Sequence, residues 1–303
     1  MQILDRLTYI NNSSLALGYF DGIHAGHRVV LNTAVREARK NNTKSVVILF
    51  KTHPLTFLTG QNIEHLLSFN ERLEMLDELG VDNVIALDFK DYAFIEAKKY
   101  LEDILVKYFS PIAITTGFNH FFGANKEGNS ELLRNCQNKF NYRYYEIPPY
   151  TVNSELVSCS NIRNLIKSNN LYEANKLLGY DFFITGEVIK GEMIASKLGF
   201  ASANVLYPKD KINMPFGVYF VKVKINTETF NGILNHGCSP TFNKQNNVKT
   251  EVHLIDFDKD IYGKKIKISF VRKIREQIKF ENIDKLKEQI NRDMAIADMY
   301  DRF

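Results

Sequence analysis

The stretch GYFDGIHAGH, residues 18–27, decides how the first half of this chain folds. The apolar segment 14–20 predicts a buried strand, and the segment 28–39 predicts a helix. The two histidines, His24 and His27, are therefore expected where a strand passes into a helix. The amide groups at the start of a helix have no partners within it and attract anions, so this stretch predicts a turn that binds phosphate.

The composition of this turn suits a nucleotide. Imidazole N–H groups can donate hydrogen bonds to charge that develops on a phosphoryl group, and the small residues Gly22, Ala25 and Gly26 let a nucleotide approach the main chain closely. The alternative is a tight turn that carries two surface histidines, but the preceding Phe20-Asp21 pair favours the binding site. For Asp21 three roles stay open: orienting a histidine, helping to bind Mg2+, or shaping the turn.

The bulk composition is that of a globular protein large enough for two domains. The 303 residues are 45% hydrophobic and 24% charged, with a formal net charge of +4, and a chain of this length can hold two independent cores. The mild positive charge suits anionic small molecules as well as nucleic acid and does not decide between them.

The lack of a recognisable targeting signal and the number and spacing of the cysteines indicate a cytoplasmic protein. No apolar run approaches the roughly 20 residues of a membrane helix, and the N-terminus lacks the pattern of a signal peptide. Cys136, Cys159 and Cys238 are far apart and odd in number. This spacing predicts neither a disulfide framework nor a zinc site, and it fits a reducing compartment. We expect a cytoplasmic protein without a membrane partner.

The first half alternates strand-like and helix-like segments. Short β-branched runs predict strands at 46–50, 84–87 and 112–115, and amphipathic segments predict helices at 70–79 and 93–108. This alternation is typical of a parallel sheet with crossover helices, which binds ligands at the carboxyl ends of its strands.

Three segments that are candidates for ligand binding each follow a predicted strand. They are the histidine stretch 18–27, the pair His53-Pro54, and the glycine-bounded segment 117–123. Because the carboxyl ends of parallel strands meet at one edge of a sheet, we expect the three to converge on one crevice.

The second half of the chain is predicted to consist mainly of strands. Strands are predicted at 184–189, 218–225, 251–257 and 265–270, separated by turn residues and without a long helix between them. This pattern indicates a small antiparallel barrel. The last segment, 283–300, carries one apolar stripe at helical spacing, so it predicts a helix that packs on the barrel.

Eight short motifs, in order along nearly the whole chain, carry a family resemblance. They are GYFDGIHAGH (18–27), FKTHP (50–54), GFNHFFG (117–123), SCSNIR (158–163), GFASAN (199–204), GVY (217–219), GCSPTF (237–242) and EVH (251–253). In these motifs the chain resembles the prokaryotic bifunctional riboflavin kinase/FMN adenylyltransferases, also called FAD synthetases. The first and fourth motifs are the most specific, and no Walker-type phosphate loop occurs in the sequence.

The resemblance implies an α/β fold with two catalytic halves. Residues 1–180 would form a Rossmann-like nucleotidyltransferase domain, with a parallel sheet and flanking helices. Residues 181–303 would form a small antiparallel β-barrel of the riboflavin kinase type, with a terminal helix. The implied substrates and products are ATP, riboflavin, FMN and FAD, with Mg2+ as cofactor. The implied partners are these small molecules, without nucleic acid or membrane, in a monomer or weak homo-oligomer.

In the first half the resemblance implies adenylyl transfer from ATP to FMN, which releases pyrophosphate. His24 and His27 would stabilise the transferring α-phosphate, and Ser158, Ser160 and Arg163 would hold the leaving phosphates. Taken alone, the serines also fit a helix cap followed by a solvated arginine. The further implied contacts are to ATP at Gly18, Phe20, Asp21, Gly22 and Gly26, and to the flavin at His53, Pro54, Asn119 and Phe121.

In the second half the resemblance implies transfer of the ATP γ-phosphate to riboflavin. Glu251 would be the base that accepts the hydroxyl proton, although a lone acid on a strand is more often a surface residue. Ser202 and Asn204 would hold Mg2+ and ATP, Gly199 would contact ATP, and Arg275 would contact the flavin.

The chain departs from the family motifs in both halves. In the first half, Asn119 stands for an acid and His120 for an aromatic residue, which predicts a weakened contact but a working site. In the second half, Ala195-Ser196 replace a Gly-Arg pair and Ala201 replaces a proline, and Ser202 stands for threonine. The kinase half therefore departs further from the family pattern than the adenylyltransferase half.

Three rival interpretations stay open. One is a monofunctional FMN adenylyltransferase whose barrel binds flavin or supports the fold. Another is a nucleic-acid-binding regulatory protein, because residues 261–280 carry seven lysines and arginines against Glu276. The third is a fragment of a class I aminoacyl-tRNA synthetase, which the poor match of residues 195–197 to that family's lysine-rich loop disfavours.

Overall fold

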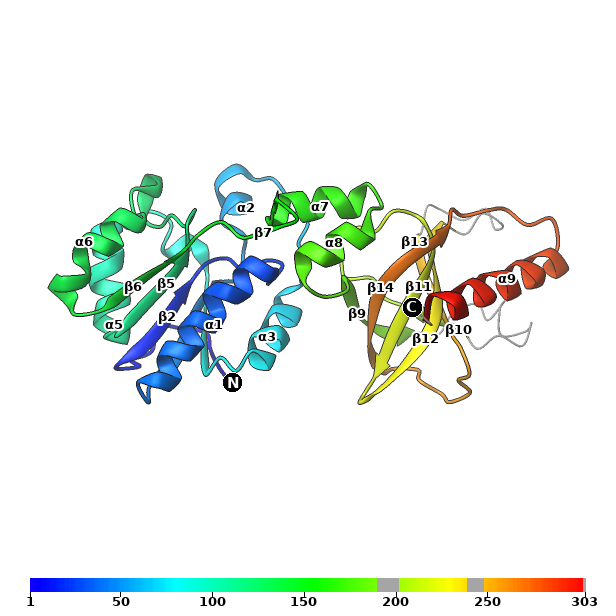
Figure 1. Cartoon of the computed structure of the whole chain (residues 1–303), viewed down its shortest axis with the longest axis horizontal. Helices are drawn as coiled ribbons and strands as arrows, with labels where there is room; N and C mark the ends of the chain where they lie inside the picture. Colours follow the sequence, from blue (N-terminus) through cyan, green and yellow to red (C-terminus); the bar gives the residue numbers. More distant parts are fainter. Residues whose placement is uncertain (190–201, 239–247, 302–303) are drawn as a thin grey trace. The chain divides into compact units, whose positions relative to one another are not determined.

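The computed structural model describes residues 1–189, 202–238 and 248–301 (Figure 1). Contacts between residues divide the chain into two compact units, Met1–Cys159 and Ser160–Phe303. The first unit is built around a parallel sheet and the second around a closed antiparallel barrel. The fold class predicted from the sequence is confirmed.

The sheet of the first unit has six parallel strands in the order β1-β4-β3-β2-β5-β6. Its central strands are buried almost throughout because helices cover the sheet, as apolar runs in parallel sheets require. The strand bounds are β1 (Gln2–Leu4), β2 (Ser13–Leu17), β3 (Lys44–Phe50), β4 (Asn83–Leu87), β5 (Ala113–Gly117) and β6 (Arg143–Ile147), with a separate hairpin of β7 (Thr151–Val152) and β8 (Glu155–Leu156).

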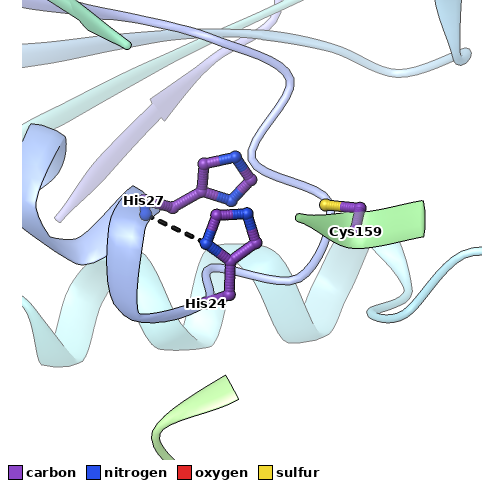
Figure 2. Close-up of side chains that lie close together, drawn as sticks. All are labelled: His24, His27 and Cys159. Carbon is purple, nitrogen blue, oxygen red and sulfur yellow. Dashed lines mark hydrogen bonds between the residues drawn. The ribbon is translucent and has the colours of Figure 1, made fainter. Parts of the chain in front are cut away.

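Helix α1 (Ala25–Lys40) follows β2 and packs along β2, β3 and β5. It begins three residues before the predicted start because the His24 side chain caps it, accepting the main-chain N–H of His27 at Nδ1 (3.2 Å, Figure 2). The other helical segments of the first unit are α2 (Pro54–Thr59), α3 (Phe69–Glu78), η1 (Phe89–Asp91), α4 (Ala97–Lys99), η2 (Tyr100–Val106), α5 (Lys107–Phe109), η3 (Ala124–Lys126) and α6 (Ser130–Phe140).

The strand order creates a switch point beside β2. From β2 the chain continues to β3 and β4 on one side, and it later returns to β5 on the other side of β2. Crevices that bind ligands form at such points, outside the carboxyl ends of the strands. The histidine stretch follows β2 and the segment 117–123 begins at the end of β5, so both lie at this edge.

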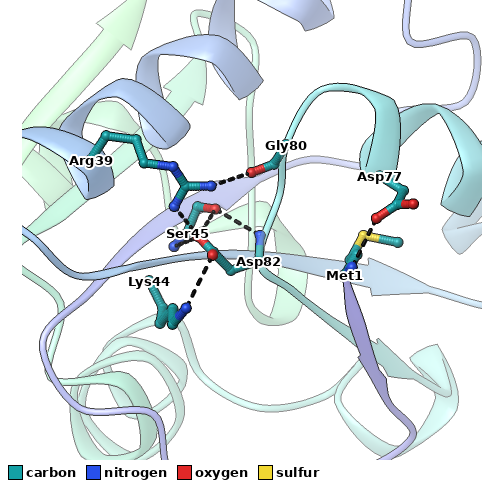
Figure 3. Close-up of polar contacts among 7 residues, drawn as sticks. All are labelled: Met1, Arg39, Lys44, Ser45, Asp77, Gly80 and Asp82. Atoms are coloured by element: carbon teal, nitrogen blue, oxygen red, sulfur yellow. Dashed lines mark hydrogen bonds and ion pairs between the residues drawn. The ribbon is translucent and has the colours of Figure 1, made fainter.

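An ion-pair cluster joins α1, β3 and the turn before β4 (Figure 3). The carboxylate of Asp82 accepts hydrogen bonds from Arg39 (2.6 Å) and from the amide and hydroxyl of Ser45 (2.9 and 2.8 Å), and Lys44 lies at 3.3 Å. Partial burial alone would raise the pKa of Asp82, but the Ser45 amide, Arg39, the Ser45 hydroxyl and Lys44 lower it from 3.8 to about 2.

We expect the substitution Asp82→Asn to destabilise the first unit by about 1–2 kcal/mol at pH 7, because it removes the charge that Arg39 and Lys44 neutralise. The folded-state pKa lies below the ordinary value of 3.8. The stabilisation is therefore complete above about pH 4 and is lost as the pH falls towards 2. Urea unfolding of both proteins at pH 7 and at pH 3 measures this difference.

Glu96→Gln is the matched control, since Glu96 pairs with Lys99 at 3.7 Å and both side chains are 66% exposed. An exposed pair contributes little, so this variant should unfold within about 0.5 kcal/mol of the parent. An Asp82→Asn variant as stable as the control would contradict the account of the cluster.

The second unit begins with two helices, α7 (Cys159–Lys167, whose first residue closes the first unit) and α8 (Leu171–Leu178). The closed barrel follows, with antiparallel strands in the order β10-β13-β12-β11-β14-β9. The predicted barrel is therefore confirmed. Its strands are β9 (Phe183–Ile189), β10 (Ser202–Val205), β11 (Gly217–Ile225), β12 (Glu228–Cys238), β13 (Val248–Leu254) and β14 (Lys265–Arg275).

The terminal helix α9 (Ile283–Asp301) packs on the barrel, as its apolar stripe predicts. Ala297 is fully buried against Val218, Phe220 and Ile233. The guanidinium of Arg275 on β14 binds the carboxylate of the buried Asp293 of α9 through two nitrogens, at 2.8 to 3.1 Å, which fixes the helix along the barrel.

None of the helices in residues 1–189, 202–238 and 248–301 is both long and apolar enough to cross a membrane.

Candidate active site

The histidine stretch makes an irregular turn between β2 and α1. Phe20 and Ile23 both have positive φ angles, +52° and +37°, and both are buried. A β-branched residue such as Ile23 rarely adopts a positive φ, because its side chain crowds the main chain. Such strain persists where the surrounding structure enforces it, which is common at functional sites.

The two imidazoles stack on each other within this turn. The ring centroids of His24 and His27 are 3.6 Å apart and the planes differ by 15° (Figure 2). Burial lowers the pKa of His24 from 6.5 to about 4, and burial and the neighbouring His24 hold the pKa of His27 well below 6.5. Both rings are therefore neutral near pH 7, and each carries one N–H group.

The helix cap fixes which nitrogen of His24 carries its proton. Since Nδ1 accepts the His27 amide, Nε2 must be the N–H donor of the neutral ring. His27 Nδ1 is buried, and no hydrogen-bond partner for it exists within the described part of the chain. A buried polar atom normally has a partner, so a ligand that supplies one fits this position.

Two glycines of the stretch, Gly18 and Gly26, lie close to the aromatic rings around them. A Cβ on Gly18 would lie 2.8 Å from the Phe20 ring, and one on Gly26 would lie 3.2 Å from Tyr150 and 3.4 Å from the His24 ring. Phe20 in turn meets His27 edge-on at 5.3 Å. Larger residues at these glycines would displace the aromatic rings that hold the histidines.

Asp21 anchors a segment of the chain that is distant in sequence. Its buried carboxylate accepts the amide of Leu66 at 3.0 and 3.2 Å and lies 3.5 Å from Nδ1 of His65. The charge also acts to raise the pKa of His24 and His27, although burial outweighs it. These contacts suit a residue that positions the turn.

A cavity of about 650 Å³ opens beside His27. Gly18 to Phe20, Pro54 and the segment 117–123 all contribute to its wall, so the three predicted binding segments do meet in one crevice. Most of the wall is apolar and aromatic, which suits a flat aromatic ligand. The ring-bearing side chains include Phe50, Phe89, Tyr92, Phe94, Tyr100, Phe121 and Phe122.

The sequence-predicted flavin residues of the first unit lie at or beside this cavity. Pro54, Asn119 and Phe121 line it, and the Phe121 side chain is exposed. His53 caps α2 by accepting the Leu55 amide at Nδ1 (3.1 Å). The ring centroids of His53 and Tyr19 are 4.3 Å apart in an edge-on contact. His53 therefore does not line the cavity itself but packs against Tyr19, which does.

Sequence reasoning missed most of the aromatic wall, notably Phe89, Tyr92 and Phe94. The segment 93–108 was predicted as one helix, but α4 begins at Ala97 and residues 100–106 are π-helical. The chain before Ala97 forms a short turn that carries these rings to the cavity. The close spacing of three aromatic residues ahead of an amphipathic segment was the available signal.

Gly123 lets the cavity wall pass close to α4. Its φ is +72°, and a Cβ added there would lie 2.5 Å from the Cα of Ala97. We expect Gly123→Ala to destabilise the first unit by at least about 2 kcal/mol, through this clash with the main chain and the unfavourable φ. The urea-unfolding midpoint measures the effect.

Gly60→Ala separates the two causes, because Gly60 has a similar φ of +70° with no atom within 4 Å of an added Cβ. This variant should lose about 1 kcal/mol, the cost of the positive φ alone. Equal losses in the two variants would show that the approach to Ala97 does not matter.

The remaining predicted residues divide between the two units. Ser158 belongs to the first unit, while Ser160 and Arg163 lie on α7 in the second. In the barrel, Asn204 of β10 is paired in register with Glu251 of β13, and Ser202 is two residues along the same strand. These three side chains are half-buried and share one face, because residues directly opposite on antiparallel strands project to the same side.

Several kinase motif residues lie outside the described residues, namely Gly199, Ala195, Ser196 and Ala201, together with the turn 239–242. Arg275 is predicted to contact flavin, and in the structure its guanidinium donates a hydrogen bond to the carboxylate of Asp293. Its flavin contact stays a prediction.

Comparisons with known protein families and with individual proteins give matches in both halves of the chain. The FAD synthetase family matches residues 8–161, and the riboflavin kinase family matches residues 178–300. The bifunctional riboflavin kinase/FMN adenylyltransferase of Buchnera aphidicola subsp. Schizaphis graminum is 33% identical over 96% of this chain and 94% of its own length. The enzyme of the same name from Escherichia coli K12 is 33% identical over 93% of this chain and 91% of its own length.

A solved structure also resembles the chain over its length. It is described as a macrolide-efflux protein from Streptococcus pneumoniae, with 28% identity and a TM-score of 0.86, covering 98% of this chain and 99% of the other. The two family matches and the relatives of nearly equal length lead to one assignment. The chain belongs to the bifunctional riboflavin kinase/FMN adenylyltransferase family.

Proposed function

We propose that this chain converts riboflavin to FMN and FMN to FAD, using residues 181–303 for the first step and residues 1–180 for the second. The observation that carries the proposal is the aromatic cavity that ends at His27, where the carboxyl ends of β2 and β5 meet. A flavin ring suits the cavity wall, and its phosphate suits the histidine turn.

In the first unit, the FMN phosphate attacks the α-phosphorus of ATP, and pyrophosphate leaves. Neutral His24 donates from Nε2 to the α-phosphate, since its Nδ1 accepts the amide that caps α1. His27 supplies a second N–H group from the stacked ring. Fixed donors stabilise the charge that builds up during transfer, and phosphoryl-type transfer needs such positioning more than covalent help.

The remaining contacts of this step rest on the motifs. Ser158, Ser160 and Arg163 bind the leaving phosphates through hydroxyl groups and a guanidinium fork. Gly18, Phe20, Gly22 and Gly26 shape the nucleotide contact, and Asp21 acts through the loop that it anchors at Leu66.

In the barrel, Glu251 accepts the proton of the riboflavin 5′-hydroxyl, which then attacks the γ-phosphate of ATP. The oxygen-bearing side chains of Ser202 and Asn204 share a face with Glu251 across the β10–β13 pair. Oxygen donors are the ligands that Mg2+ prefers, so this face fits a magnesium–ATP complex. When bound, Mg2+ would neutralise phosphate charge.

The match to the riboflavin kinase family favours the bifunctional enzyme over a monofunctional adenylyltransferase, although the kinase half departs from the family motifs at Ala195, Ser196 and Ala201. Separate assays with riboflavin and with FMN decide between the two. ADP and FMN formed from riboflavin and ATP would support the bifunctional enzyme. Pyrophosphate released from FMN and ATP, with no ADP formed from riboflavin, would support the monofunctional one.

We further expect a cytoplasmic monomer or weak homo-oligomer that uses small-molecule substrates and binds no nucleic acid. Two cations of the basic segment 261–280 are engaged within the unit, which supports the absence of nucleic-acid binding. Lys273 pairs with Glu276 at 2.6 Å, and Arg275 pairs with Asp293. Binding to a nucleic acid that falls steeply with salt and resists ATP and flavin would contradict this expectation.

A further inference from the structure

The thiol of Cys159 lies beside the two stacked imidazoles. The atoms of His24, His27 and Cys159 that can bind a metal all lie within 4.8 Å of one another. Figure 2 shows the Cys159 sulfur directed towards the rings. Among the residues that the structure describes, no other three histidine, cysteine or acidic side chains bring their ligand atoms this close.

The chemistry of these donors selects the ion. Two imidazoles and one thiolate prefer Zn2+ and similar transition metals, whereas Mg2+ prefers oxygen ligands. Three protein ligands leave the fourth position of a tetrahedral zinc ion open for water or another ligand. In this turn, the buried His27 Nδ1 has no hydrogen-bond partner within the described residues, so a metal ion would also satisfy an unpaired nitrogen.

We propose that His24, His27 and Cys159 form a binding site for a thiophilic divalent transition-metal ion, Zn2+ in the first place, and that this ion and ATP exclude each other. The ligand atoms must move closer than they stand, since Zn–N and Zn–S bonds are about 2.1 and 2.3 Å long. Cys159 is half-buried and forms no disulfide.

The mutual exclusion of zinc and ATP follows from the positions of the imidazole ring protons, and it rests on the proposed function. A nitrogen that binds zinc has no proton to donate, so His24 Nε2 cannot hold the metal and the α-phosphate at the same time. Binding through His24 Nε2 also moves the ring proton to Nδ1, which ends the hydrogen bond that caps α1. Metal binding itself does not depend on the proposed function.

Equilibrium dialysis of the full chain, reduced and stripped of metal, tests the site with Zn2+ as the probe in the presence of excess Mg2+. We expect one tightly bound zinc ion per chain. Cys159→Ser should weaken its binding at least tenfold, because a hydroxyl is a poor zinc ligand. Cys136→Ser and Cys238→Ser are matched controls that should bind zinc as the parent does.

His24→Asn is a second variant that protects against a folding artefact. Asparagine keeps an oxygen that can cap α1 but removes the imidazole, so this variant should stay folded by circular dichroism and lose zinc binding. Zinc bound equally by the parent and by Cys159→Ser, or not bound by the parent, would overturn the proposed site.

The exclusion is tested by FAD formation from FMN at fixed ATP with increasing Zn2+. The zinc concentration for half inhibition should rise with ATP in the parent, and in Cys159→Ser it should be at least tenfold higher. Inhibition that is independent of ATP would overturn the exclusion. A protein that made FAD without binding zinc would overturn the proposed zinc site and leave the proposed function standing. A protein that bound zinc at this cluster and made no FAD would overturn the proposed function and leave the zinc site standing.

Discussion

His27→Ala is expected to lower the rate of FAD formation from FMN and ATP by at least about 100-fold, which is the usual effect of removing a fixed donor from a site of developing charge. The reason is the position of His27, on the first turn of α1 and in the wall of the aromatic cavity. Phosphorylation of riboflavin by the same variant should be unchanged, because the residues proposed for it lie in the barrel. Initial rates of FAD and FMN formation measure the two steps.

Comparison with His27→Gln separates the hydrogen bond from the shape of the ring. Glutamine offers an N–H donor, so it should recover part of the lost rate. If the alanine variant formed FAD at nearly the rate of the parent, His27 would not be a catalytic residue. Loss of both activities with a lowered unfolding midpoint would instead indicate damage to the fold.

Glu251→Gln should have the opposite pattern. We expect phosphorylation of riboflavin to fall by about 10²- to 10⁴-fold, because the amide keeps the shape of the side chain but cannot accept the hydroxyl proton. FAD formation from added FMN should continue at the rate of the parent. Release of ADP in the presence of riboflavin measures the first effect, and release of pyrophosphate in the presence of FMN measures the second.

Glu228→Gln is the matched control in the same barrel. Glu228 begins β12 and pairs with Lys259 at 3.8 Å, with both side chains well exposed, so its loss should change neither activity. Equal kinase rates in Glu251→Gln and Glu228→Gln would remove Glu251 from the reaction.

The sheet was predictable because its strands are short apolar runs with distinct flanks. Residues 46–50 and 84–87 fall within β3 and β4, and both strands are almost fully buried. The edge strand β6 (RYYEI) escaped prediction because it is only half-buried and carries charged residues. In the barrel, β12 (ETFNGILNHGC) was missed because glycines and polar residues interrupt its apolar pattern.

The histidine turn was predictable in kind but not in its internal contacts. The motif indicated a phosphate-binding junction, and the structure places His24 as the cap of α1. No local pattern shows that Asp21 binds the Leu66 amide, since the two residues are 45 positions apart. Likewise, the spacing of the cysteines along the chain indicated no zinc site, because the fold alone brings Cys159 to His24 and His27.

The most direct test of the two-step account follows the label from ATP into the flavin products, with riboflavin as the only flavin supplied. With ATP labelled at the γ-phosphate, we predict labelled FMN and then labelled FAD. With ATP labelled at the α-phosphate, we predict label in FAD and none in FMN. Absence of label from FMN and FAD in both experiments, or γ-label in FMN without α-label in FAD, would contradict the account.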